Sequence, residues 1–124
     1  MTGASGFLGS RLLDRIGDRS GRIVCLGRRK IPARGPNVEF VGGNLPDREA
    51  CRKALKGCDT VLHLAAATGK HRREEYFQVN RDGTAALLEQ ARQAGVTRFL
   101  YVSTIAAKFD SYLAKGGAKH SAAV

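Results

Sequence analysis

The sequence has no tryptophan, one methionine, three prolines and three cysteines, and only 6% of its 124 residues are aromatic. The cysteines, Cys25, Cys51 and Cys58, lack the spacing of a metal site, and one would stay unpaired in any disulfide scheme. We therefore expect no metal centre, reduced thiols and a cytoplasmic protein. No apolar run approaches the ~18 residues that span a bilayer, and charged residues interrupt the only apolar stretch near the N-terminus. We expect neither a membrane segment nor a secretory signal.

The charge is strongly unbalanced, with 21 Lys and Arg against 11 Asp and Glu and a net charge of +10. A basic surface attracts polyanions in general, but here the positive residues are dispersed and no basic run is interleaved with aromatics. A solvated basic surface is therefore favoured over specific nucleic-acid binding. The apolar fraction of 43% and charged fraction of 26% are those of a globular domain.

The apolar periodicity predicts seven elements in the order helix, strand, strand, helix, strand, helix, strand. They cover residues 7–16, 23–26, 38–41, 47–57, 60–64, 74–94 and 98–102. This alternation predicts an α/β fold, a Rossmann-like doubly wound parallel sheet with helices on both faces. Its first strand is expected to be absent or incomplete, because only Met1 precedes the first turn. We assign residues 1–109 to this domain and residues 110–124, rich in Gly, Ala, Ser and Lys, to a divergent or frayed tail.

Two of the predicted helices have expected core faces. The first helix would bury Phe7, Leu8, Leu12, Leu13 and Ile16. The last would keep Phe77, Thr84, Leu88 and Ala91 on one side. Asp47 is expected to cap the middle helix, and Gly57 to close it.

The segment from Thr2 to Gly9 carries glycine at every third position, Gly3, Gly6 and Gly9, directly before a helix. Such glycines let a backbone turn sharply, approach a pyrophosphate and pack a helix against a sheet. The helix then directs its free N–H groups and positive dipole end at the phosphates. Glycine-rich loops without a function are also common, so the spacing alone leaves both interpretations open.

The residue that ends the second strand of a dinucleotide fold lies near the adenosine ribose. An acid there would accept a hydrogen bond from the 2′-hydroxyl of NAD, but this chain has Gly27-Arg28-Arg29. Guanidinium groups pair with a phosphate in a forked geometry, so Arg28 and Arg29 favour NADP over NAD. The alternative is that both arginines only begin a solvated loop.

Five segments resemble the extended short-chain dehydrogenase/reductases, the family of NAD(P)-dependent sugar epimerases, dehydratases and related reductases. They are Thr2 to Gly9, Gly43 to Asp47, Gly57 to Ala66, Val79-Asn80 with Gly83-Thr84, and Tyr101 to Thr104. The resemblance covers about residues 1–109. It implies the cofactor-binding part of such an enzyme, acting by hydride transfer at a carbinol or carbonyl carbon of a sugar nucleotide or other small substrate. The substrate lobe would be missing, and the full-length relative could be a homodimer.

The resemblance also implies roles for individual residues. Pyrophosphate would be held by Gly3, Ser5, Gly6, Phe7, Leu8 and Gly9. Asn44, where the family usually has aspartate, and Leu45 would lie beside the adenine. Ala65 and Ala66 would line the ribose and nicotinamide, Asn80 would face the sheet as a cofactor-side or packing amide, Ser103 would contact cofactor and Thr104 would hydrogen-bond substrate.

The family's chemistry uses a tyrosine that exchanges a proton with substrate and a lysine four residues later. In this chain Asn80, Ile105 and Gly116 stand four residues after Tyr76, Tyr101 and Tyr112. Tyr112 remains the candidate proton donor, although Lys115 lies one residue short. His63 is expected to be a core histidine rather than a catalytic one. The alternatives to an enzyme are an NADP-binding regulatory module without turnover and an inactive gene fragment.

Overall fold

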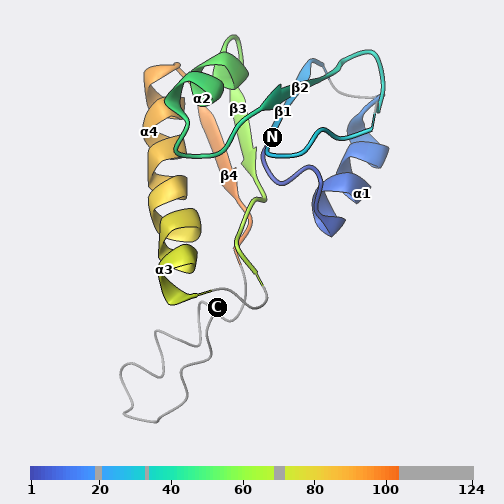
Figure 1. Cartoon of the computed structure of the whole chain (residues 1–124). Coiled ribbons are helices and arrows are strands. Elements are labelled where there is room, and N and C mark those ends of the chain that lie inside the picture. Colours follow the sequence, from blue (N-terminus) through green and yellow to red (C-terminus); the bar gives the residue numbers. More distant parts are fainter. Residues whose placement is uncertain (19–20, 33, 69–71, 104–124) are drawn as a thin grey trace.

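Four parallel strands form the centre of the computed structural model, which describes residues 1–18, 21–32, 34–68 and 72–103. β1 (Ile23–Gly27) pairs with β2 (Val38–Gly42), with Ile23 opposite Val38. β3 (Thr60–His63) pairs with β4 (Arg98–Tyr101), with Thr60 opposite Arg98. Both pairs run in the same direction (Figure 1).

Met1 and Thr2 lie between the two strand pairs and join them. The amino group of Met1 donates to the Val24 carbonyl at 2.7 Å, and the Leu26 N–H donates to the Met1 carbonyl at 2.9 Å. On the other side, the Thr2 N–H donates to the Leu62 carbonyl at 3.0 Å. Thr2 thereby forms parallel bridges to both Leu26 and His63. The sheet order is β2, β1, Met1–Thr2, β3, β4, so the expected first strand is incomplete rather than absent.

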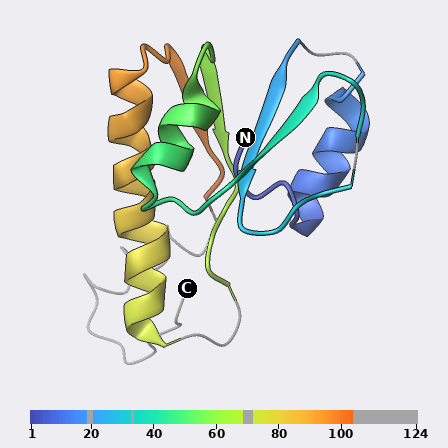
Figure 2. The same cartoon turned by 45° about the horizontal axis from the view of Figure 1, so that its top comes forward.

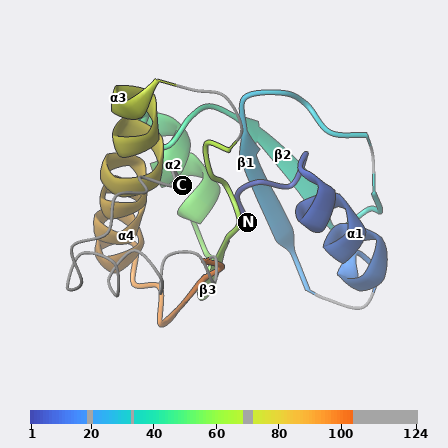
Figure 3. The ribbon, with the colours of Figure 1, turned by 90° about the horizontal axis from the view of Figure 1, so that it is seen from below.

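Helices cover both faces of this sheet (Figures 2 and 3). α1 (Phe7–Ile16) packs on one face, where Ala4, Leu13 and Cys25 are buried. α2 (Arg48–Leu55) and α4 (Thr84–Gln93) pack on the other. The larger core lies there and consists of Val24, Leu26, Val41, Leu45, Ala50, Cys51, Ala54, Leu55, Val61, Leu87 and Ala91. The doubly wound α/β architecture expected from the sequence is confirmed.

The two ends of α2 are set by the expected residues, Asp47 and Gly57. The Asp47 carboxylate accepts a hydrogen bond from the Ala50 N–H at 3.0 Å, which satisfies one free donor of the first turn of α2. Gly57, with φ +70°, follows α2 in the left-handed conformation that ends helices.

The expected core faces of two helices were partly wrong. In α1 only Gly9 and Leu13 are buried, whereas Phe7 is 83% exposed. Leu8 in the same turn is 53% exposed, so α1 is buried only from Gly9 onward. In α4 the buried side chains are Leu87 and Ala91, and Leu88 is 51% exposed.

The segment before α4 also differs from the prediction. The segment from α3 (Arg73–Tyr76) to α4 is a π-helix, Phe77–Gly83, not the continuous α-helix that the sequence predicts. Its wider turn holds more residues than an α-helical turn, so Phe77 loses its register with the face of α4. Gly83 is buried against Leu45, and a β-carbon at Gly83 would lie 3.0 Å from that side chain.

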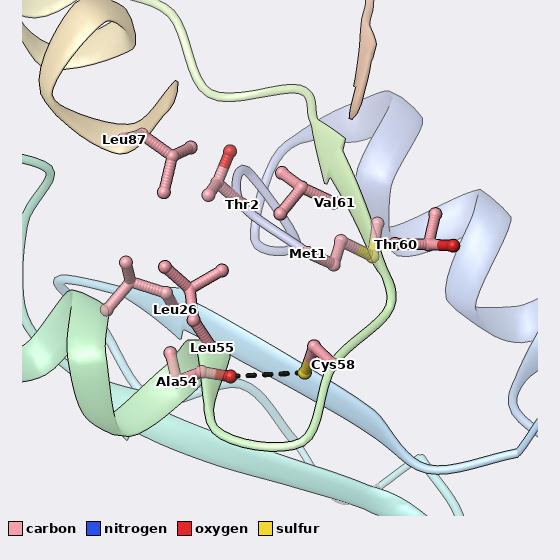
Figure 4. Close-up of a pocket in the computed structure, with 9 residues that line it drawn as sticks. All are labelled: Met1, Thr2, Leu26, Ala54, Leu55, Cys58, Thr60, Val61 and Leu87. Carbon is pink, nitrogen blue, oxygen red and sulfur yellow. Dashed lines mark hydrogen bonds between the residues drawn. The ribbon is translucent and has the colours of Figure 1, made fainter. Parts of the chain in front are cut away.

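Two of the hollows in the described part of the chain lie away from Gly3, Gly6 and Gly9. One of ≈ 20 Å³ lies in the core between the sheet, α2 and α4, lined by residues including Leu26, Val61 and Leu87 (Figure 4). The other, of ≈ 600 Å³, lies at the amino ends of β1 and β3, beside Ile23 and Thr60. All three cysteines are free thiols. Within the described residues, no helix has the length and apolar character to cross a membrane.

Candidate dinucleotide site

The glycine turn follows Thr2 at the carboxyl edge of the sheet. Gly3 has φ +74°, and a β-carbon there would lie 2.6 Å from the backbone nitrogen of Ala65. A β-carbon at Gly9 would collide with the carbonyl oxygen of Gly3 and lie 2.8 Å from the Cα of Ala4. Both contacts are with backbone atoms that cannot move aside. Only glycine fits at these two positions, as a turn that packs a helix tightly against a strand end requires.

The amino end of α1 opens from this turn. Gly6 is the N-cap residue, has an extended conformation and provides no side-chain cap. The N–H groups of Phe7, Leu8 and Gly9 therefore point out of the first turn, together with the positive end of the helix dipole. Ser5 and Gly6 are exposed beside them. This is the geometry with which a helix binds a phosphate.

The segment after β3 borders the turn and is held by two side chains. The Ala65 N–H donates to the Thr2 hydroxyl at 3.2 Å. The carboxamide of Asn80 accepts from the Ala67 N–H at 2.7 Å and donates to the Ala67 carbonyl at 3.1 Å. Ala65 is half-buried and Ala66 is exposed. Asn80 thus fixes the loop that continues from these alanines.

Arg28 and Arg29 are exposed directly after Gly27, the last residue of β1. Neither arginine takes part in the ion pairs recorded for the described residues, whereas Arg34 in the same connection pairs with Asp14. Two guanidinium groups without a carboxylate partner can meet a phosphate.

The two residues expected near the adenine differ in what they offer. Asn44 is exposed, and its side-chain oxygen accepts from the Asp47 N–H at 3.0 Å, forming the turn that begins α2. Its amide NH₂ is a further hydrogen-bond donor. The Leu45 side chain is buried in the core, so any contact of Leu45 with a ligand would be through its backbone.

The remaining predicted site residues follow β4. Ser103 is exposed just beyond the end of that strand, and because β4 runs parallel to β3, it lies at the same sheet edge as the segment after β3. Thr104 and Tyr112 lie outside the described residues. The structure therefore brings the predicted cofactor residues from the glycine turn, β1, β3 and β4 to one edge, where parallel strands of an open sheet bind ligands.

His63 lies immediately below this edge and is completely buried. Its Nδ1 is 2.6 Å from the Thr2 hydroxyl and its Nε2 is 2.9 Å from the Thr84 hydroxyl. Burial, with a smaller effect from the Met1 ammonium group, lowers the pKa of His63. The expectation of a core histidine is confirmed. That Thr2 is its partner could not be predicted from the sequence, since the two residues are 61 positions apart.

The donor set fits the diphosphate of a dinucleotide. Side chains at Gly3 or Gly9 would fill the space in the turn, and the first turn of α1 has no side-chain cap. The exposed Arg28 and Arg29 lie at the end of the neighbouring strand β1. Such an arrangement can bind an anionic ligand against backbone N–H groups.

A family model decides the classification: the NAD dependent epimerase/dehydratase family matches residues 1–114 of the chain. The chain belongs to this family. Among its relatives are a 3 beta-hydroxysteroid dehydrogenase/Delta 5-->4-isomerase of Mycobacterium tuberculosis, 35% identical over 114 residues, and a ceramide reductase of Caulobacter vibrioides, 37% identical over 114 residues. These alignments cover 84% and 90% of this chain but 30% and 36% of the relatives.

Solved structures of epimerase/dehydratase relatives share the fold. Uronate dehydrogenase from Agrobacterium tumefaciens aligns with a TM-score of 0.74 and 30% identity, over 83% of this chain and 39% of the enzyme. MoeE5 in complex with UDP-glucuronic acid and NAD aligns with a TM-score of 0.74 and 34% identity, over 83% of this chain and 35% of MoeE5. The chain thus spans about a third of the length of these relatives, and its fold is their Rossmann-like part.

Proposed function

We propose that this chain binds a nicotinamide dinucleotide at the carboxyl edge of its sheet, as the cofactor-binding part of an NAD(P)-dependent epimerase, dehydratase or reductase. The observation that carries the proposal is the glycine turn. Gly3 and Gly9 hold the backbone where no side chain fits, and the uncapped end of α1 opens beside them. The pyrophosphate would accept hydrogen bonds from the N–H groups of residues 7–9.

The bound cofactor would donate or accept a hydride. The chain's own residues would orient it: Ala65 and Ala66 would lie along the ribose and nicotinamide, with Ser103 beside them. Thr104 would hydrogen-bond the oxygen of a small-molecule substrate, and Tyr112 is the candidate proton donor. The UDP-glucuronic acid in the MoeE5 structure supports a sugar nucleotide as one possible substrate class, and the steroid relatives support another.

Arg28 and Arg29 support a preference for NADP over NAD. Both are exposed after β1, where the cofactor's adenosine ribose would lie, and no carboxylate occupies that place. A 2′-phosphate would meet two guanidinium groups, whereas the 2′-hydroxyl of NAD would gain no acceptor from them. The NAD bound in the MoeE5 structure keeps NAD as the alternative cofactor.

Calorimetric titration of the chain with NADPH and NADH tests both parts of this proposal. We expect NADPH to bind more tightly, and the Arg28→Ala/Arg29→Ala variant to lose about tenfold or more in NADPH affinity while NADH affinity stays unchanged. Arg52→Ala is the matched control, since Arg52 is an exposed arginine of α2 that pairs with Glu49. Equal affinities for the two cofactors would contradict the NADP preference, and no saturable binding of either would contradict the proposed function.

A second candidate is a module that binds NADP without turnover, supported by the absence of a lysine four residues after Tyr76, Tyr101 or Tyr112. Asn80 stands four residues after Tyr76, and its carboxamide is engaged with Ala67. Turnover assays with sugar-nucleotide, steroid and simple carbonyl substrates distinguish the two candidates. NADPH binding without loss of its absorbance favours the module, and oxidation by any of these substrates favours the enzyme.

A further inference from the structure

The side chain of His63 is fully buried, and its ring is held by Thr2, Thr84, Phe99 and Tyr101. The ring of Tyr101 stacks on it with centroids 5.4 Å apart, and the ring of Phe99 meets it edge-on at 6.1 Å. Both aromatic residues belong to β4. A histidine so confined keeps one ring orientation, so its two nitrogens have fixed partners.

The hydrogen bonds of Thr2 determine which ring nitrogen carries the proton. The Thr2 oxygen already accepts the Ala65 N–H, and Thr2 is only 3% exposed. If the Thr2 hydroxyl donates to Nδ1 of His63, every polar hydrogen in this group is paired. If Nδ1 were protonated, the Thr2 oxygen would accept from both Nδ1–H and the Ala65 N–H, and its own hydroxyl proton would be buried without the acceptor that Nδ1 provides, which is costly. The neutral ring protonated at Nε2 is therefore favoured.

This tautomer forms a continuous connection across three elements. Nε2–H of His63 donates to the hydroxyl of Thr84, the first residue of α4. Nδ1 accepts from Thr2, which precedes Gly3, and the Thr2 oxygen holds the N–H of Ala65. The Gly3 backbone packs so closely on Ala65 that a β-carbon would lie 2.6 Å from the Ala65 nitrogen.

We infer that His63 is a positioning residue, which through the Thr2 hydroxyl holds the Ala65 end of β3 against the glycine turn. It contacts no ligand itself. Instead it orients the Thr2 hydroxyl, whose oxygen fixes Ala65. The distance between the glycine turn and the Ala65 backbone is thereby held constant. The expected effect on NADPH affinity rests on the proposed function. The hydrogen bonds between His63, Thr2 and Ala65 do not depend on it.

Protonation of the ring would reverse this arrangement. An imidazolium donates from both nitrogens, so Nδ1 would no longer accept the Thr2 hydroxyl proton. The Thr2 oxygen would then face two donors, Nδ1–H and the Ala65 N–H, while its own buried proton lost the acceptor that orients it, which weakens the hydrogen bond to Ala65. The groups that face the ring are the Met1 ammonium, the Thr84 hydroxyl from α4, and the Phe99 and Tyr101 rings from β4. In the described part of the chain no carboxylate contacts the ring to stabilise its charged form. NADPH affinity should therefore fall as pH drops below the usual histidine range.

The test combines spectroscopy with matched variants of the full chain. In a ¹⁵N spectrum at neutral pH, His63 should show a protonated Nε2 and an unprotonated Nδ1. Thr2→Val should weaken NADPH binding about tenfold and speed hydrogen exchange at Ala65, because it removes the hydroxyl but keeps the side-chain shape. Thr2→Ser should restore both to within about twofold, since it returns the hydroxyl. Thr97→Val, at an exposed hydroxyl before β4, should change neither.

His63→Asn is a further check on the ring itself, since its side-chain oxygen can accept from Thr2 near the position of Nδ1. It should retain Ala65 protection better than His63→Phe, which offers no acceptor. A protonated Nδ1 at neutral pH, or equal Ala65 exchange in Thr2→Val and wild type, would overturn the inference. If the wild-type chain binds neither NADPH nor NADH, the proposed function fails, while the tautomer and the Ala65 exchange rates still decide the role of His63.

Discussion

The carboxamide of Asn80 forms two hydrogen bonds with the backbone of Ala67, accepting from its N–H at 2.7 Å and donating to its carbonyl at 3.1 Å; we call this pair of bonds the Asn80 clasp. Asn80 lies in the π-helical segment, and Ala67 lies in the connection after β3. The clasp therefore fixes the path of the chain from Ala65 and Ala66, which line the proposed cofactor site. An amide is the one side chain type that offers both a donor and an acceptor at this spacing.

Asn80→Asp should destabilise the fold. The substitution keeps the shape of the side chain but replaces its donor with an oxygen facing the Ala67 carbonyl. We expect a loss of about 1–3 kcal/mol in the free energy of unfolding, measured by urea denaturation at neutral pH. Gln78→Glu makes the same chemical change at an exposed residue of the same segment and should have little effect. Equal losses in the two variants would show that the clasp contributes nothing specific.

Much of the architecture could be predicted because its signals are local. The apolar runs, the Asp47 cap and the glycines after helices lie within a few residues of the structure they determine. Each expected strand is present, as are the first two helices, and the third is α-helical at both ends. The π-helical segment was not predicted, since apolar periodicity was compared with a 3.6-residue turn. The same periodicity predicts Phe7 in the core, whereas the first turn of α1 is exposed.

The contacts that organise the candidate site are long-range and could not be predicted from spacing. Thr2 and His63 are 61 residues apart, and Ala67 and Asn80 lie in separate elements. The sequence indicated a buried histidine and a polar residue facing the sheet, but not their partners. Likewise, the two-residue strand at Met1 and Thr2 depends on hydrogen bonds to both β1 and β3, and no local pattern of two residues could reveal it.

Gly9→Ala should reduce both stability and NADPH affinity, although it adds only one methyl group. The added methyl group would collide with the carbonyl oxygen of Gly3, so the turn or α1 must shift. We expect a stability loss of about 1–3 kcal/mol by thermal or urea unfolding, together with at least a tenfold loss of NADPH affinity. Gly21→Ala is the control, because nothing lies within 4 Å of a β-carbon there. The steric account would be wrong if Gly9→Ala bound NADPH as the wild type does.

Stability should decline with acidification in a way that depends on His63. Its pKa is lowered in the folded chain by burial and then by the Met1 ammonium, so the unfolded chain takes up a proton more readily. The corresponding stability is fully present above the unfolded histidine pKa of about 6.5 and is lost as pH falls through the lower folded value. The free energy of unfolding, measured in urea between neutral and mildly acidic pH, should fall less steeply with decreasing pH for His63→Asn than for wild type. Identical slopes would exclude His63 as the source.

The central claim is that a dinucleotide binds at the glycine turn, and amide chemical-shift mapping tests it most directly. NADPH added to the ¹⁵N-labelled chain should shift the N–H signals of residues 6–9 most strongly, followed by those of Ala65 and of Arg28 and Arg29. The signals around Cys58 and Thr60, beside the large hollow at the opposite edge of the sheet, should stay in place. Saturable shifts centred on that opposite edge, with residues 6–9 unchanged, would contradict the account.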